Sequence, residues 1–272
     1  ANTVGSIQYN AAVGAEAIQA SANTTGAVQY NAALGYEALE IVANTTGSIQ
    51  YNAAVGYRAL KTASNTTGNV QYNVAVGANA LLVNVANNNI AVGHEALKAN
   101  TTGTRNTAVG VSAISTITTG IDNTAIGYDA LKVGTGNTNT AMGSYALTAN
   151  STGSGNTAIG HDSSLAITTG GENTSLGINS LRTATTGSFN TGLGGGALQS
   201  TTTASNNTAV GYNSLQANTT GTDNVAVGSN AADANTTGSD NTAIGDNALG
   251  ANTTANSNTA VGADALLVNT TG

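Results

Sequence analysis

The chain has 272 residues with one Phe, one Met, no Trp and no Cys, so it can build neither a rounded core of large side chains nor a disulfide framework. Its six Lys and Arg against thirteen Asp and Glu give a formal net charge of −7, and the absence of a basic stripe argues against a nucleic-acid partner. No apolar run of about 18 residues is present, so we expect no insertion into a membrane.

A single phrase recurs fifteen times: an asparagine, two small or β-branched residues, an aliphatic residue and a glycine, as in N-T-A-V-G at 106–110. A short fixed period over a whole chain indicates one supersecondary unit, here called a coil, stacked on itself. Counting from the glycine as position 0, position −4 is always Asn, position −2 is small and position −1 is aliphatic. Position +3 is Ala or Ser, and position +4 is Leu or Ile in thirteen copies.

Residues 1–84 form the first predicted block, in which successive motif glycines are 21 residues apart. Each of these coils carries an extra phrase such as S-I-Q-Y at 6–9, which we expect to lengthen a strand or to add a short third side. The tyrosines of this phrase are predicted to form a column of stacked rings; they are Tyr9, Tyr30, Tyr51 and Tyr72. The stretch 81–90 is the expected transition to a narrower cross-section.

Residues 85–272 form the second predicted block of the same continuous domain, with coils of 16–17 residues. In every coil, positions −4 to −1 alternate and are short, which predicts a strand that ends at the glycine. Positions +3 to +5 predict a second short strand, and the phrase N-T-T-G, as at 100–103, has the residues of a turn. The sequence therefore predicts an all-β fold, a β-solenoid of about 15 parallel coils.

The asparagine at position −4 is predicted to be structural. In a stack of coils its amide can donate to the Asn of one neighbouring coil and accept from the other, or cap the turn backbone. Asn without convergent carboxylates is a poor cation site, so we expect no metal there. The column consists of Asn10, Asn31, Asn52, Asn73, Asn89, Asn106, Asn123, Asn139, Asn156, Asn173, Asn190, Asn207, Asn224, Asn241 and Asn258.

The apolar positions also predict a partner. Residues −1 and −2 point to opposite faces of a strand, and the same is expected of residues +4 and +3, so both faces of both strands are apolar. Strands covered on two sides have this pattern, and the interior of the coil covers only one side. We therefore expect a homotrimer of parallel coils, against the alternative of a lone monomer with an outer face of small residues.

The repeat resembles those of two families of surface proteins. At N-T-A-V-G-x-x-A-L it resembles the N-S-V-A-I-G repeat of trimeric autotransporter adhesin heads, and with N-T-T-G it is similar to the arrays of phage and prophage tail fibres. The resemblance covers essentially all residues, although the coils here are longer than those of the adhesin heads. It implies a left-handed β-roll, a parallel trimer, an extended shaft and attachment to a surface.

No enzymatic activity, cofactor or metal is expected. The only two histidines, His94 and His161, occupy the variable position +1. The glycine-rich phrase G-L-G-G-G at 192–196 vaguely resembles a phosphate-binding loop, but it falls in register with the repeat and is interpreted as a variant of the usual corner. Weak calcium binding at a corner, by the aspartates that follow T-G-x (Asp122, Asp223 and Asp240), is an alternative, but the calcium-binding phrase G-G-x-G-x-D is missing.

Two further patterns leave alternatives open. Asn23, Asn44, Asn65, Asn100, Asn218, Asn235, Asn252 and Asn269 begin N-T-T and are formal N-glycosylation acceptors, whereas N-T-T-G is also turn chemistry. Threonines at position −3 form one column, which makes ice binding a function to consider; its uninterrupted run is Thr107, Thr124, Thr140, Thr157, Thr174, Thr191 and Thr208. The T-x-T spacing, which would place a second column of threonines on the same face, is missing, and ice binding is therefore the weaker alternative.

The sequence thus predicts a shaft or head segment of an extended fibre, extracellular, at a cell surface or in a virion tail, that mediates attachment to a cell. Both chain ends fall inside the repeat phrase, so subunits that stack end to end into a self-polymerising surface filament are the alternative. Candidate surface contacts, directed toward cell-surface glycans, are Tyr36, Tyr57, Arg58, Tyr128, Tyr145 and Tyr212.

Overall fold

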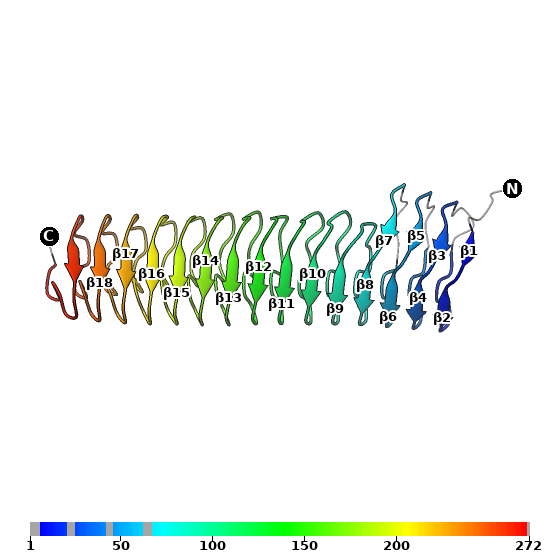
Figure 1. Ribbon diagram of the computed structural model, residues 1–272, viewed down its shortest axis with the longest axis horizontal. Coiled ribbons are helices and arrows are strands. Elements are labelled where there is room, and N and C mark those ends of the chain that lie inside the picture. Colours follow the sequence, from blue (N-terminus) through cyan, green and yellow to red (C-terminus); the bar gives the residue numbers. More distant parts are fainter. Residues whose placement is uncertain (1–5, 21–24, 42–45, 62–66, 271–272) are drawn as a thin grey trace. The chain divides into compact units, whose positions relative to one another are not determined.

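The computed structural model describes residues 6–20, 25–41, 46–61 and 67–270 and divides into two compact units, Ala1–Thr135 and Gly136–Gly272. The described residues of both units form strands and turns and no helix. Within each unit, parallel strands stack as a β-solenoid (Figure 1), and the two units together contain about 14 coils. The predicted all-β solenoid fold is therefore confirmed.

Unit 1 contains two parallel sheets. Seven motif strands form the longer sheet: β2 (Ala11–Val13), β4 (Ala32–Leu34), β6 (Ala53–Val55), β8 (Val74–Val76), β9 (Ile90–Val92), β10 (Thr107–Val109) and β11 (Thr124–Ile126). The shorter sheet contains β1 (Ile7–Gln8), β3 (Val28–Gln29), β5 (Ile49–Gln50) and β7 (Val70–Gln71). Equivalent repeat positions pair directly, as in Thr107↔Thr124.

Unit 2 contains a single parallel sheet. Its strands are β12 (Thr140–Met142), β13 (Thr157–Ile159), β14 (Thr174–Leu176), β15 (Thr191–Leu193), β16 (Thr208–Val210), β17 (Val225–Val227), β18 (Thr242–Ile244) and β19 (Thr259–Val261). Each strand pairs in register with the next, for example Thr157 with Thr174. Residues at one repeat position consequently lie directly above one another through the unit.

The extra phrase of the 21-residue coils forms the shorter sheet, which ends at β7 while the longer sheet of unit 1 continues to β11. Its tyrosine rings stack as the spacing predicts: the centroids of Tyr9 and Tyr30 are 5.1 Å apart, and those of Tyr51 and Tyr72 are 5.2 Å apart with an interplanar angle of 1°. The short third side is therefore present in the first coils only.

The second strand predicted at positions +3 to +5 is wrong. These residues form turns, and the backbone at positions +2 and +4 is left-handed, with φ of +53° at Arg58 and +52° at Leu60. Left-handed residues break the period-two alternation of a strand. Ala59 and Leu60 consequently both lie in the core, each with no exposed surface, so the prediction that positions +3 and +4 face opposite sides is also wrong.

Burial of the leucine and inter-coil hydrogen bonds compensate for this unfavourable backbone. A left-handed conformation costs a non-glycine residue about 1–2 kcal/mol. Complete burial of a leucine contributes roughly 1.5–3 kcal/mol, and the Leu60 N–H also donates to the carbonyl of Ala80 in the next coil at 2.8 Å. The sequence can therefore place leucine where glycine is usually found.

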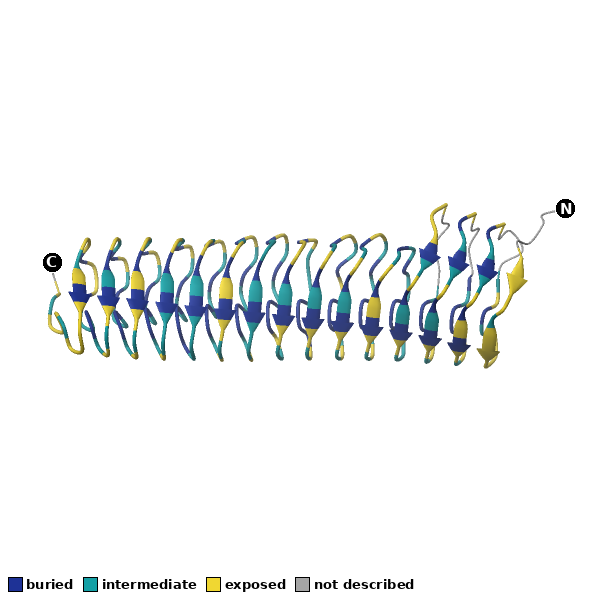
Figure 2. Cartoon of the chain, viewed as in Figure 1, coloured by how far each residue is buried: buried dark blue, intermediate teal, exposed yellow. Residues whose placement is uncertain are grey.

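The strand itself has the predicted alternation. Position −2 is buried and position −1 faces outward, as in Ala54 with no exposed surface and Val55 with 39% exposed (Figure 2). We call the position −1 column the outer ridge. In unit 1 it contains Val13, Leu34, Val55, Val76, Val92, Val109 and Ile126, and in unit 2 Met142, Ile159, Leu176, Leu193, Val210, Val227, Ile244 and Val261.

The motif glycine is required by the close stacking of the coils. Gly110 has φ of +136°, a region that L side chains rarely adopt, and a Cβ there would lie 2.4 Å from the carbonyl oxygen of Gly127 in the next coil. Where another coil follows, the position after the motif strand is therefore fixed as glycine by both conformation and space.

Candidate functional site

The asparagine column is an internal hydrogen-bond ladder. In unit 2, Nδ2 of Asn173 donates to Oδ1 of Asn156 at 3.1 Å and to the carbonyl of Gly187 in the next coil at 2.9 Å. The backbone N–H of Asn173 donates to the same Oδ1 at 3.0 Å. Asn190 repeats the arrangement one coil further on. From Asn31 to Asn241 these side chains are buried, so the column links coils and offers no surface to a ligand.

The asparagines of the N-T-T-G turns form a second internal column. Asn100 has no exposed surface, and its Nδ2 donates to Oδ1 of Asn84 at 2.6 Å and to the carbonyl of Gly103 at 3.0 Å. Ile117 takes the equivalent place in the next coil, which shows that the position faces the core and explains why Oδ1 of Asn100 has no hydrogen-bond partner.

This burial shows that most of the formal N-glycosylation acceptors are structural residues of the turns. Asn100, Asn218, Asn235 and Asn252 are fully buried, so none of them can carry a glycan in the folded chain. Asn269 is half-buried. Asn23, Asn44 and Asn65 lie outside the described residues.

The predicted surface contacts lie at the corners after the strands, where the tyrosines are exposed and Arg58 is half-buried. In unit 1 the structure brings three of them together: the rings of Tyr36 and Tyr57 stack at 5.8 Å, and Cζ of Arg58 lies 4.9 Å from the centre of the Tyr57 ring. Tyr128 of unit 1 is 49% exposed. In unit 2, Tyr145 meets His161 edge-on at 6.0 Å, and Tyr212 is 63% exposed.

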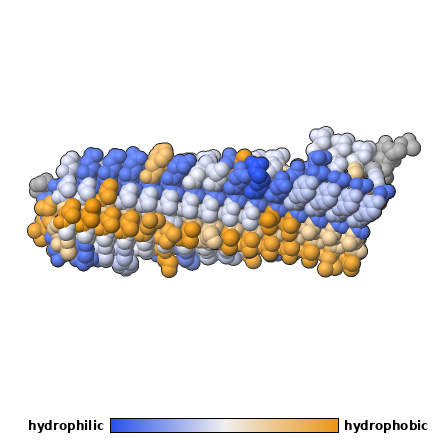
Figure 3. All heavy atoms as spheres, in the orientation of Figure 1, coloured by the Kyte–Doolittle hydropathy of each residue, from blue (hydrophilic) through white to orange (hydrophobic). Residues whose placement is uncertain are grey.

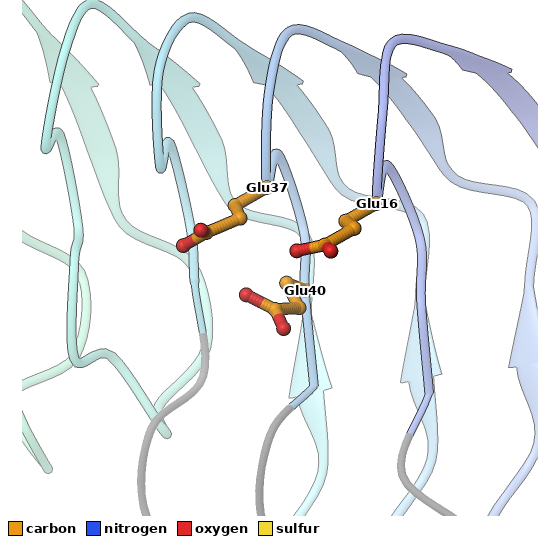
Figure 4. A group of neighbouring side chains, drawn as sticks. All are labelled: Glu16, Glu37 and Glu40. Atoms are coloured by element: carbon orange, nitrogen blue, oxygen red, sulfur yellow. The ribbon is translucent and has the colours of Figure 1, made fainter.

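The structure also brings together an acidic cluster that the sequence analysis missed. Glu16, Glu37 and Glu40 converge from neighbouring coils of unit 1 (Figure 4), with carboxylate oxygens within 4.8 Å of one another. Lys61 contacts both Glu37 and Glu40, and Nε of Arg58 donates to Glu37 at 2.8 Å. Hydrogen bonds from Lys61 and then Arg58 lower the pKa of Glu37 to about 2.

Two cations thus already neutralise most of this cluster, and we interpret it as an ion network between coils. A cation site needs carboxylate oxygens that remain available to the metal. The signal that could have revealed it is the 21-residue spacing, because Glu16, Glu37 and Arg58 all occupy position +2.

Two of the residues considered for catalysis or calcium, His161 and Asp122, have charged side chains as neighbours. Nδ1 of His161 lies 3.3 Å from Oδ1 of Asp162, whose other oxygen lies 3.3 Å from Nε of Arg182. Arg105 holds Asp122 with two hydrogen bonds of 2.6 and 2.8 Å. Asp223 and Asp240 are exposed, and the only group of three or more potential metal ligands within the described ranges is the acidic cluster.

Two clefts lie on the corner surface. The cleft in unit 1 has a volume of about 440 Å³ and is lined by Lys98, Lys132, Glu95 and neighbouring hydroxyl and aliphatic side chains. Its cations are already paired, since Lys98 contacts Glu95 at 2.6 Å and Lys132 contacts Asp129 at 2.9 Å. The cleft in unit 2 has a volume of about 340 Å³ and lies at Gly195.

Comparison with known proteins gives no relative for this chain: no protein-family model matches it, and neither a curated protein nor a solved structure is significantly similar to it. None of the described residues belongs to a helix with the length and apolar character needed to cross a bilayer.

Proposed function

We propose that the chain is a structural and adhesive segment, shaft or head, of an extended extracellular or virion fibre that attaches to a cell surface. The observation that carries the proposal is the in-register repetition of one coil through both units. A stack in which each coil contacts only its neighbours builds length and a long regular surface rather than one enclosed pocket. The resemblance to adhesin heads and tail fibres supports the same role and, with it, a left-handed coil.

The outer ridge supports assembly into a parallel homotrimer. Figure 3 shows apolar side chains gathered along the strands of each unit, and ridge residues are substantially exposed, for example Val76 at 37% and Leu176 at 50%. Soluble monomers rarely expose long contiguous apolar surfaces. In a parallel trimer every ridge residue meets the ridge of another copy, and the ridges become a common core.

Sedimentation analysis of a charged ridge variant tests the assembly. The chain should sediment at three times its mass of 26.5 kDa, and Val109→Glu should shift it toward the monomer because it places a charge in the shared core. Val111→Glu is the matched control, because Val111 is 45% exposed against 36% for Val109 but lies off the ridge. A wild-type chain that is a stable monomer refutes the trimer.

The role itself is tested by electron microscopy and by cell binding. Purified protein should appear as discrete rods, and fluorescently labelled protein should adhere to the surface of the target cell. Continuous filaments of indefinite length would favour the self-polymerising alternative. Compact particles without adherence would contradict both.

A further inference from the structure

We propose that the cleft at Gly195 and Gly196 in unit 2 binds a neutral pyranose sugar. The inference rests on the proposed attachment role and deepens it by naming the class of ligand and the residues that hold it. Two observations support it: the side-chain columns at positions +1 and +2 are interrupted at these glycines, and the side chains around the gap have the chemistry that a sugar requires.

The cleft exists because one coil lacks two side chains that its neighbours have. At positions +1 and +2 the preceding coil carries Ile178 and Asn179, and the following coil carries Tyr212 and Asn213. Gly195 and Gly196 occupy the same positions between them, so backbone forms the floor and the flanking side chains form two walls. The resulting volume is about 340 Å³, within the range of small-ligand sites.

The width suits a single sugar ring. Parallel strands lie about 4.8 Å apart, so walls two coils apart are separated by roughly 9.5 Å. A ring in van der Waals contact with both walls needs about 3.5–4 Å on each side. One pyranose therefore fills the space, and a second ring cannot enter beside it.

One wall is an aromatic ring with room in front of it. Tyr212 is 63% exposed, and a Cβ built on Gly195 would lie 3.7 Å from Cδ2 of that ring, in ordinary contact. Ile178 on the opposite wall is 61% exposed. Aromatic and aliphatic surfaces of this kind pack against the C–H face of a sugar.

The polar groups of the cleft are amides. Oδ1 of Asn213 lies 2.4 Å from the position of a Cβ on Gly196, and Oε1 of Gln199 lies 3.5 Å from it, so both acceptors converge on the space left by the glycine. Nε2 of Gln216 donates to Oε1 of Gln199 at 3.2 Å, which fixes their arrangement.

Amides supply both donors and acceptors, which is what neighbouring sugar hydroxyls require. The residues that line the cleft carry no formal charge, which favours a neutral sugar over an acidic one. The cleft of unit 1 differs in both respects, since its lining includes ion-paired lysines and no aromatic ring.

Saturation-transfer NMR tests the site with methyl glycosides of glucose, galactose and mannose, with N-acetylglucosamine, and with the anionic sugar N-acetylneuraminic acid. At least one neutral sugar should receive saturation at millimolar concentration. Tyr212→Ala should weaken that binding by about tenfold through loss of the aromatic wall. Tyr128→Ala, which removes a tyrosine at the same repeat position in unit 1, should leave it unchanged.

A variant that fills the cleft gives an independent test. Gly195→Ile with Gly196→Asn copies the neighbouring pair Ile178–Asn179. The new Cβ at position 196 displaces only the amide end of the Asn213 side chain, and binding should disappear. Ser229→Ile adds the same side chain at position +1 of another coil and should have no effect. Binding that survives the filled cleft, binding of the anionic sugar alone, or no binding of any neutral probe would each overturn the site.

The site and the attachment role fail separately. A filled-cleft protein that adheres to cells as well as wild type overturns the site as the adhesive contact and leaves the attachment role intact. A wild-type protein that binds a neutral sugar but does not adhere overturns the attachment role and leaves the site intact.

Discussion

Replacing Gly192 by alanine should destabilise the wild-type fold but stabilise a chain that already carries Ser180→Ala. Gly192 lies in β15 at position −2, where thirteen of the fifteen coils have Ala. A Cβ on Gly192 would lie 2.6 Å from Oγ of Ser180, which donates to the Gly192 carbonyl at 2.9 Å, and 3.3 Å from the carbonyl oxygen of Ala197. Ser180 is fully buried, so its hydroxyl cannot move into solvent.

The magnitudes follow from these contacts. In wild type, the extra methyl group overpacks the core and should destabilise the fold by about 1–3 kcal/mol. Ser180→Ala alone removes a hydroxyl proton that is shared between the carbonyls of Gly192 and Ala197, worth about 1 kcal/mol. In that background the space is free, and Gly192→Ala should stabilise by about 0.4–1 kcal/mol, because it restricts the unfolded chain. The two substitutions should therefore couple by roughly 1.5–4 kcal/mol.

Urea denaturation of the four proteins of this cycle measures the coupling, and hydrogen exchange of the β15 amides shows whether the change is local to that coil. If Gly192→Ala destabilises equally with and without the Ser180 hydroxyl, the steric argument is refuted. A shift of the whole exchange profile without a change at β15 would also count against it.

Three further predictions concern single residues. Asn173→Ala should destabilise unit 2 by about 2–6 kcal/mol in urea, because the buried N–H of Asn190 and one turn carbonyl lose their partners. Glu37→Gln should remove an acid-dependent part of the stability: the pKa of Glu37 is lowered from 4.5 to about 2, so its pairing with Lys61 stabilises above pH 4.5 and is lost as pH falls toward 2. The melting temperature of the variant should accordingly vary less than that of wild type across this window. Gly110→Ala should lower the melting temperature of unit 1 through clash and strain, and an unchanged melting temperature would contradict the role of the motif glycine.

The strands could be predicted because each repeat position repeats one residue type. The alternation with period two before each motif glycine predicts β10 and its equivalents. The same pattern predicts that Ala108 is buried and that its neighbour Val109 is exposed. The turn after the glycine could not be predicted in this way. Ala-Leu has the composition of a short strand, and Leu60 at φ of +52° has no glycine or asparagine to signal a left-handed backbone.

The ion pairs and clefts of the surface could not be predicted without knowing which residues of neighbouring coils lie side by side. Glu37 and Arg58 are 21 residues apart and form an ion pair only because the coils stack position on position. In the sequence alone, Gly195 and Gly196 are only a glycine-rich variant of the corner that every repeat has. They become the floor of a cleft only when the side chains of the coils before and after are placed beside them.

The exceptions to the repeat are coupled from one coil to the next. Ser164 and Ser175 depart from Leu and Ala at positions +4 and −2, and their hydroxyls are 2.7 Å apart, with Ser163 Oγ also 2.7 Å from Ser175. Ser180 and Gly192, 12 residues apart, compensate in volume rather than in hydrogen bonding. In these two contacts a serine at +3 or +4 is accompanied by a changed residue at −2 of the following coil, whereas Ser214 at +3 donates to the carbonyl of an unchanged Ala226 at 3.0 Å. Ser175→Ala alone would leave the buried Ser164 hydroxyl without its partner, at a cost of about 1–3 kcal/mol, whereas Ser163 Oγ would keep its hydrogen bond to the Ser175 backbone carbonyl at 3.2 Å. The residues that meet between neighbouring coils therefore constrain one another, and a substitution in this fold has to be evaluated together with its contact in the next coil.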